Sequence, residues 1–183
     1  AGGTQTIIAT EPAVTLGDNT QITAGTLTKN TTNNIISRFK LDVSAANNAT
    51  VNAITFTTTG TAVHSTDISN FKLWYATSNS FGSASQIGST ITTSLGAGTR
   101  SFTGLTQTIN FSSTGYFWIT ADIPAGATSG NTLAVSAIAT GDITLASGSK
   151  SGSISAAGTQ TISSVITLYS IAGGGNWTDN TRW

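Results

Sequence analysis

Carboxylates, the groups most often used in acid–base catalysis, are scarce in this sequence. Hydrolysis of a glycosidic bond needs two of them on facing elements, one kept protonated by its surroundings. The chain has a single Glu, Glu11, and its Asp residues are isolated from one another: Asp18, Asp42, Asp67, Asp122, Asp142 and Asp179. Asp67 and Asp142 lie at predicted turns and Asp122 lies near the end of a predicted strand, directly after residues 116–121, where a carboxylate usually accepts backbone N–H groups. We therefore expect structural roles. Calcium held by loop carbonyls and one or two of these three Asp is an alternative that their spacing does not single out.

Nucleophilic catalysis lacks its partners as well. His64 is the only His, and its sequence neighbours Ser65 and Asp67 cannot align with it as a triad from one loop. The chain has no G-x-S-x-G turn and no Cys, which excludes a thiolate nucleophile, a disulfide and a Cys-based zinc site. We therefore predict a protein that is not an enzyme, with no catalytic residue, no assigned metal ligand and no cofactor.

Three aromatic side chains are the best candidates for contact with a ligand. Tyr116 and Trp118 are predicted to share the more polar face of one strand, and Trp74 shares its face with Lys72. A solvent-facing aromatic ring beside hydroxyl, amide or carboxylate groups can stack on the C–H face of a sugar. The alternative, which we favour, is that these three rings cover the second sheet or a contact between modules.

The composition excludes several classes of partner. Charged residues make up 8% of the 183 residues and the net charge is zero, against roughly 25% charged residues in an ordinary soluble domain. Such a chain has no electrostatic footprint for nucleic acid, and no apolar run approaches the roughly 20 residues of a membrane-spanning helix. We expect no nucleic-acid partner and no membrane insertion. Thr supplies about a fifth of the chain, Lys and Glu are few, and Cys and Met are absent, which favours a secreted or cell-surface location.

Apolar and polar residues alternate with a period of two, which predicts β-strands rich in Thr, Val and Ile. The predicted strands are 35–43, 51–57, 71–76, 105–111, 116–123, 132–138 and the pair Ile143 with Leu145. The residues predicted to face inward include Ile35, Ser37, Phe39, Leu41 and Val43 in the first strand, Phe71, Leu73 and Tyr75 in the third, and Phe117, Ile119, Ala121 and Ile123 in the fifth. About eight short strands separated by turn residues predict an all-β fold, a two-sheet antiparallel β-sandwich of Ig-like or jelly-roll-like type.

A short sequence recurs near the two ends of the chain. Residues 3–7 and residues 158–162 both read GTQTI, a shift of about one domain length. We predict that residues 1–7 are the tail strand of a preceding repeat or an exchanged terminal strand, and that residues 8–163 form the β-sandwich module. Residues 164–183 are predicted to be a linker and the truncated start of a following module. Because few charges and only two Pro protect the sheet edges, we expect a terminal segment or a neighbouring copy to cover at least one edge.

Several segments of residues 33–162 occur in a characteristic order. They are IISRFKLDV at 35–43, ITFTTTGT at 54–61, DISNFKLWY at 67–75, SF at 80–81, GYFWITADI at 115–123, ATSGN at 127–131 and AGTQTI at 157–162. In this order they resemble the family known as the BNR-repeat neuraminidase N-terminal domain. The resemblance implies a non-catalytic β-sandwich on exported proteins of Bacteroidetes-type bacteria, commonly sent out by the type IX route, with no catalytic residue to carry over. Residues 173–183 also look like the G-N-W-x-D-x-x-x-W opening of another module in such proteins.

Together these features predict a non-catalytic structural or adhesive β-sandwich repeat of a large secreted or cell-surface bacterial protein, of the adhesin type. Its expected partners are neighbouring copies or modules of the same polypeptide. Two alternatives stay open. One is a carbohydrate-binding accessory domain of a secreted sialidase-type glycosidase, which would hold surface glycans through Trp74, Tyr116 or Trp118. The other is a self-assembling extracellular fibre subunit in which residues 4–8 complete a neighbour's sheet.

Overall fold

The computed structural model describes residues 11–45 and 47–164, and this part of the chain is almost entirely β-structure. The strands are β1 (Ala13–Asp18), β2 (Gly25–Thr28), β3 (Thr31–Ser44), β4 (Ala49–Thr59), β5 (Asn70–Ala76), β6 (Ser85–Ile91), β7 (Gly98–Phe102), β8 (Gln107–Ile109), β9 (Thr114–Ile123), β10 (Thr132–Val135), β11 (Ile143–Leu145), β12 (Ser149–Gly152) and β13 (Gln160–Ser163). Two short 3-10 helices, η1 (Phe81–Ser83) and η2 (Thr140–Asp142), interrupt the loops.

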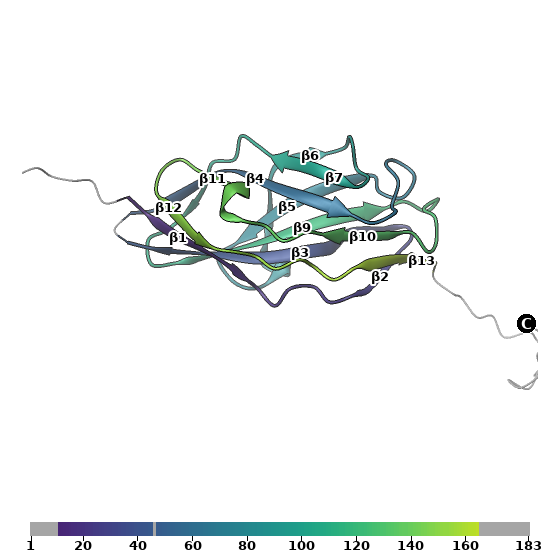
Figure 1. Cartoon of the computed structure of the whole chain (residues 1–183), viewed down its shortest axis with the longest axis horizontal. Coiled ribbons are helices and arrows are strands. Elements are labelled where there is room, and N and C mark those ends of the chain that lie inside the picture. Colours follow the sequence, from purple (N-terminus) through teal and green to yellow (C-terminus); the bar gives the residue numbers. More distant parts are fainter. Residues whose placement is uncertain (1–10, 46, 165–183) are drawn as a thin grey trace, which may run out of the picture.

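The strands form two sheets packed face to face, which confirms the predicted all-β sandwich (Figure 1). One sheet has the order β12-β1-β3-β9-β5-β6; the other has the order β11-β4-β10-β13-β2, and β7 and β8 also pair with β4. Both sheets are mixed, whereas the sequence predicts antiparallel sheets throughout. The two parallel pairs join strands from opposite ends of the chain, β1 with β12 and β2 with β13. Two strands so distant in sequence are not joined by a hairpin, so local turn signals do not fix their direction.

Aromatic rings from both sheets form the centre of the core. Phe39 and Phe117 stack within the first sheet with ring centroids 5.3 Å apart, and Phe56 and Phe102 stack at 5.3 Å within the second. Phe56 also meets Phe71 of the opposite sheet edge-on at 5.5 Å, so this contact joins the two layers. All five rings are buried. Every residue predicted to face inward on β9 is buried, but Trp118, Thr120 and Asp122 on its other face are buried as well, so burial does not alternate along this strand.

One part of the predicted inward face of β3 is wrong. Ile36 is fully buried, whereas Ile35 is only half-buried, although the period-two pattern places Ile35 inside. The register between β3 and β9 shifts between Ile35 and Ser37, which marks a β-bulge. An extra residue in one strand reverses which side chains point inward beyond it, so Ile36 joins the core while Ser37, Phe39 and Leu41 keep their predicted side.

Some predictions concern residues that the structure does not describe. The first copy of the recurring pentapeptide, the proposed exchange strand at residues 4–8 and the module opening at residues 173–183 all lie outside the described residues. The second copy ends within β13, which pairs with both β10 and β2. Within the described part of the chain, no helix is long and apolar enough to cross a membrane.

Candidate functional site

The two tryptophans proposed as ligand contacts lie side by side on the outer face of the first sheet. Trp74 on β5 pairs directly with Trp118 on β9. The loop between β5 and β6 places Phe81 of η1 against both rings, with centroids 5.4 Å from Trp74 and 5.9 Å from Trp118. Trp118 is only 2% exposed, and the Trp74 Nε1–H donates to Thr120 Oγ1 at 2.9 Å. Trp118 therefore has no free face on which a sugar could stack.

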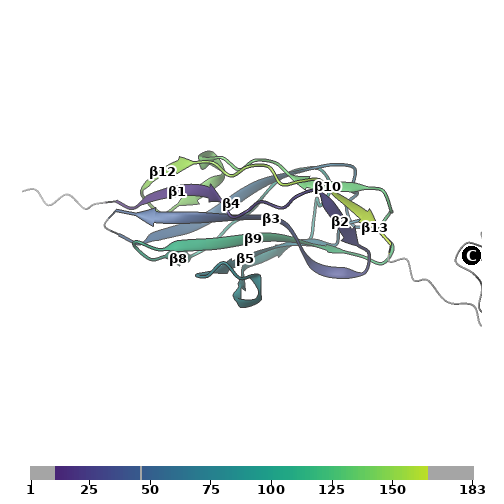
Figure 2. The same ribbon diagram turned by 90° about the horizontal axis from the view of Figure 1, so that it is seen from below.

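The covering loop is fixed by its own hydrogen bonds. Ser83 Oγ donates to the Ser80 carbonyl at 2.9 Å and lies 3.0 Å from Ser78 Oγ. Asn79 accepts a 2.7 Å hydrogen bond from the side chain of Asn19, which follows β1. Figure 2 shows this loop projecting below β5 and β9. The loop thus holds Phe81 in place over the two tryptophans. Together the three rings form a small second core on the outer face of the sheet.

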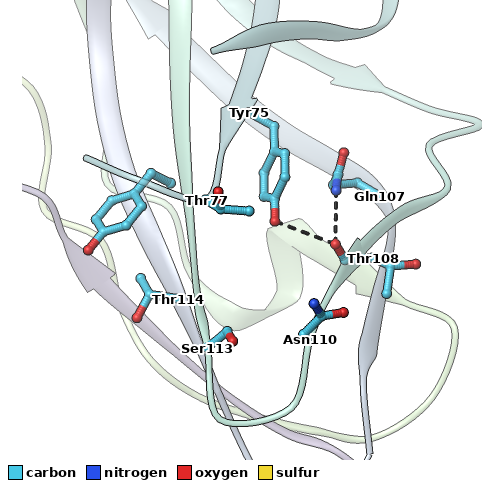
Figure 3. A pocket seen from close by; sticks show the side chains of 8 residues that line it. Tyr75, Thr77, Gln107, Thr108, Asn110, Ser113 and Thr114 are labelled. Carbon is cyan, nitrogen blue, oxygen red and sulfur yellow. Dashed lines mark hydrogen bonds between the residues drawn. The ribbon is translucent and has the colours of Figure 1, made fainter. Parts of the chain in front are cut away.

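Tyr116, the third proposed ligand residue, lines an open hollow. We call this hollow the tyrosine groove; it has a volume of about 490 Å³ and is lined by Tyr75, Thr77, Gln107, Thr108, Asn110, Ser113, Thr114 and Tyr116. The groove lies where β5 and β8 end and β9 begins. Figure 3 shows that the Tyr75 ring and the polar side chains of the β8–β9 loop point into the same space. The lining carries no charged group and offers hydroxyl and amide groups beside two aromatic rings.

Local bonds fix several groups of the groove. The Tyr75 hydroxyl and the Gln107 side chain both donate to the Thr108 carbonyl, at 3.5 and 2.9 Å. Burial raises the pKa of Tyr75, so its phenol is neutral at neutral pH. Thr114 Oγ1 donates to Asp42 at 2.5 Å, and Asp42 also forms an ion pair with Lys40 at 2.8 Å. The nearest carboxylate is thus already occupied, and the groove itself presents a neutral surface.

Sequence reasoning misses most of this groove. The pattern predicts that Tyr75 faces inward, and its ring does pack against the core and lies 5.2 Å from Phe117. Because Tyr75 stands near the end of β5, its hydroxyl extends past the core to the open end of the sheet. Gln107 and Asn110 lie on β8 and in the loop after it. These segments are distant from β5 in the sequence and come close to its end only in the folded protein. No sequence spacing links these residues.

Every Asp in the described residues is committed to a structural hydrogen bond, as expected for the turn residues Asp67 and Asp142. The bonds run from Ser155 to Asp18, from Thr114 and Lys40 to Asp42, from Val63, Thr128 and Asn131 to Asp67, from Asn33 and Lys72 to Asp122, and from Ala139 to Asp142. Burial alone would raise the pKa of Asp42, Asp67 and Asp122, but these bonds outweigh it and hold each pKa below its ordinary value. These carboxylates are ionised at neutral pH.

His64 does not form a catalytic group with its neighbours. Its Nδ1 accepts the Leu95 backbone N–H at 3.2 Å, whereas Asp67 binds the backbone of Val63 and Thr128. Within residues 11–45 and 47–164, no group of three or more His, Asp or Glu side chains is arranged to hold a metal ion.

No family model matches this chain, and no curated protein matches it. The resemblance to the BNR-repeat neuraminidase N-terminal domain stays a prediction that rests on the segments quoted above.

Proposed function

We propose that this chain is a non-catalytic, load-bearing β-sandwich module of a secreted or cell-surface bacterial protein of the adhesin type, connected in series with neighbouring modules. One observation carries the proposal: the first two strands pair in parallel with the last two. We call β1–β12 and β2–β13 the terminal strand pairs. Their registers join Ala13–Leu16 to Ser149–Gly152 and Gly25–Thr28 to Gln160–Ser163.

The terminal strand pairs are oriented to resist tension along the molecule. β1 begins at one end of the long axis and β13 finishes at the other (Figure 1). A force applied at these two ends pulls β1 and β12 in opposite directions along a shared ladder, and it loads β2 and β13 in the same way. The hydrogen bonds between the paired strands are then perpendicular to the force and must break together. When two strands are instead pulled apart from one end, their hydrogen bonds break one pair at a time.

Other features support a structural role outside the cell. The described Asp residues and His64 are engaged in bonds that hold loops and strands together. The surface is rich in hydroxyl groups and almost free of charge, so its contacts are insensitive to salt. The absence of Cys and Met leaves no sulfur to oxidise. Neighbouring modules of the same polypeptide are the proposed partners.

The substitution Gly152→Ala tests the role of the terminal strand pairs. Gly152 has a φ of +78°, and a Cβ there would lie 2.3 Å from the carbonyl oxygen of Leu16 on β1. Alanine should therefore separate β12 from β1 at a cost of about 2 kcal/mol. We expect a folded variant that breaks at a clearly lower force than the wild type when pulled by its two ends in a single-molecule experiment.

Gly126→Ala is the matched control, because a Cβ at Gly126 meets nothing within 4 Å. It should leave the rupture force unchanged. An equal rupture force for wild type and the folded Gly152→Ala variant would contradict the proposed load path.

A second candidate function, the binding of neutral glycans, is favoured by the tyrosine groove. Two aromatic rings beside neutral hydroxyl and amide groups match the alternating apolar and hydroxyl faces of a sugar. The absence of charge from the lining favours an uncharged glycan over a sialylated one. In this second candidate function, Tyr116 remains a ligand contact, as predicted from the sequence. Tyr75 takes the place of Trp118, which is covered.

Loss of the Tyr116 ring should weaken glycan binding without unfolding the protein. We expect Tyr116→Ala to bind neutral pentasaccharides of glucose, mannose or N-acetylglucosamine about tenfold more weakly than wild type, as judged by NMR titration. Trp74→Phe is the control, since Trp74 lies beneath Phe81 and outside the groove. Equal binding by Tyr116→Ala and wild type, or no binding by wild type at millimolar sugar, would reject the glycan function.

A further inference from the structure

Three side chains from neighbouring strands converge on the outer face of the first sheet. Lys72 on β5 reaches across β9 to β3, and its Nζ lies 3.0 Å from Asn33 Oδ1 and 2.8 Å from Asp122 Oδ2. The other carboxylate oxygen of Asp122 accepts the Asn33 backbone N–H at 2.6 Å. The Lys72 amine is therefore in contact with both the Asn33 carboxamide and the Asp122 carboxylate, and Asp122 also binds the Asn33 backbone.

The backbone and the surroundings hold this contact in place. Asn33 has a φ of +56° and lies where the register of β3 against β9 is interrupted, so its side chain is presented to Lys72 by a local break in the ladder. The side chains of Asp122 and Lys72 are only 9% and 19% exposed. Beside them, Asn70 on β5 pairs with Asp122 on β9. The Asn70 Oδ1 atom is buried without a hydrogen-bond partner. Such a site excludes most water from the pair and keeps the amine against the Asn33 side chain.

We propose that Lys72 and Asn33 form an intramolecular isopeptide bond, with Asp122 as the acid–base group. Asp122 takes a proton from the Lys72 ammonium along their hydrogen bond, and the neutral amine attacks Asn33 Cγ. The new Nζ–Cγ bond forms, Asp122 gives its proton to Nδ2, and the Cγ–Nδ2 bond breaks. Asp122 then takes the surplus proton from Nζ and releases it to solvent. The products are a Lys–Asn amide and one ammonia. No oxidant, cofactor or co-reactant is needed, because the leaving group comes from Asn33 itself.

The bond would connect β3 to β5 across the central strand β9. A covalent link between these strands would close the chain from residue 33 to residue 72 and prevent β3, β9 and β5 from separating completely. This inference does not depend on the proposed load-bearing role or on the tyrosine groove. It concerns a covalent modification that is read directly from the mass of the protein.

The mass of the full chain, purified in its folded state and then denatured, tests the proposal. We expect it to be lower than the sequence mass by one ammonia. Trypsin should leave peptide 30–38 joined to peptide 41–100, because an acylated Lys72 is no longer cleaved. Lys72→Arg retains the positive charge but not the amine nucleophile, so it should have its full sequence mass. Asn33→Ser should also have its full mass, and both variants should remain folded by circular dichroism.

Two outcomes would overturn the proposal. One is a wild-type mass equal to the sequence mass after prolonged incubation of the folded protein at neutral pH. The other is a loss of ammonia that persists in Lys72→Arg, since this would indicate a succinimide formed by an asparagine alone. If Asp122→Asn also folds, it should keep its full mass, and cross-linking in that variant would remove Asp122 from the mechanism.

Discussion

Trp118→Ala is expected to lower the free energy of unfolding by about 4 kcal/mol. Trp118 is almost completely buried between its neighbour Trp74 and the covering residue Phe81. Removing its ring leaves a cavity on the outer face of the sheet and takes away the surface against which Phe81 packs. The measurement is chemical denaturation of the wild type and the variant, followed by far-ultraviolet circular dichroism.

Phe111→Ala is the control for this substitution. Phe111 is also aromatic, but it is 51% exposed, so its loss should change the free energy of unfolding by less than about 0.5 kcal/mol. A Trp118→Ala protein as stable as the Phe111→Ala protein would show that the tryptophan pair is not part of the stabilising core. It would also restore Trp118 as a candidate for ligand contact.

Asp67→Asn is expected to destabilise the protein by about 3 kcal/mol at neutral pH. The Asp67 side chain is fully buried and accepts the N–H groups of Val63 and Thr128 and the Asn131 amide at 2.7–2.8 Å. In asparagine an NH₂ group replaces one of these acceptors, so two donors face each other in a buried site. Thermal and urea denaturation of both proteins at pH 7 measure the effect.

The pH dependence gives Asp67→Asn a second readout. Burial opposes ionisation of Asp67, but its hydrogen bonds prevail and lower its pKa below the unfolded value near 4. A lowered pKa adds stability above that unfolded value, and the contribution is lost as the pH falls through the folded pKa. Wild type should therefore lose stability below about pH 4, and Asp67→Asn should lose less over the same range. Asp142→Asn serves as a comparison at neutral pH. It removes the acceptor of a single backbone hydrogen bond, so it should lower the free energy of unfolding by only about 1 kcal/mol. An acid transition of Asp67→Asn identical to that of wild type would contradict the assignment.

The sequence predicts the layers of this fold better than its edges. Alternating apolar residues identify β3, β4, β5 and β9, because these strands bury a face in the core. The pattern misses β1, β2, β6, β7, β12 and β13, most of which are rich in Thr, Ser and Gly. Except for β1 and β13, these strands bury few side chains and therefore have little apolar periodicity to detect. Their pairing partners depend on the whole fold.

The candidate site could be predicted only in part, for two physical reasons. The more polar face of β9 is recognisable in the sequence, but nothing in the sequence shows that Phe81 folds back over Trp74 and Trp118. The tyrosine groove combines residues of β5, the β8–β9 loop and β9, and these meet only at one end of the sandwich. The contact of Lys72 with Asn33 likewise depends on the position of β9 between their strands.

Pulling the protein in two directions tests its load-bearing role most directly. Because the chain has no Cys, Glu11→Cys with Ser164→Cys defines attachment points at the two ends of the described segment. Glu11→Cys with Ser44→Cys instead pulls near the paired residues Ala13 and Ser44, which peels β1 from β3 one pair at a time. We predict a rupture force several times higher between residues 11 and 164 than between residues 11 and 44. An equal or lower force between residues 11 and 164 would show that the terminal strand pairs do not resist shear.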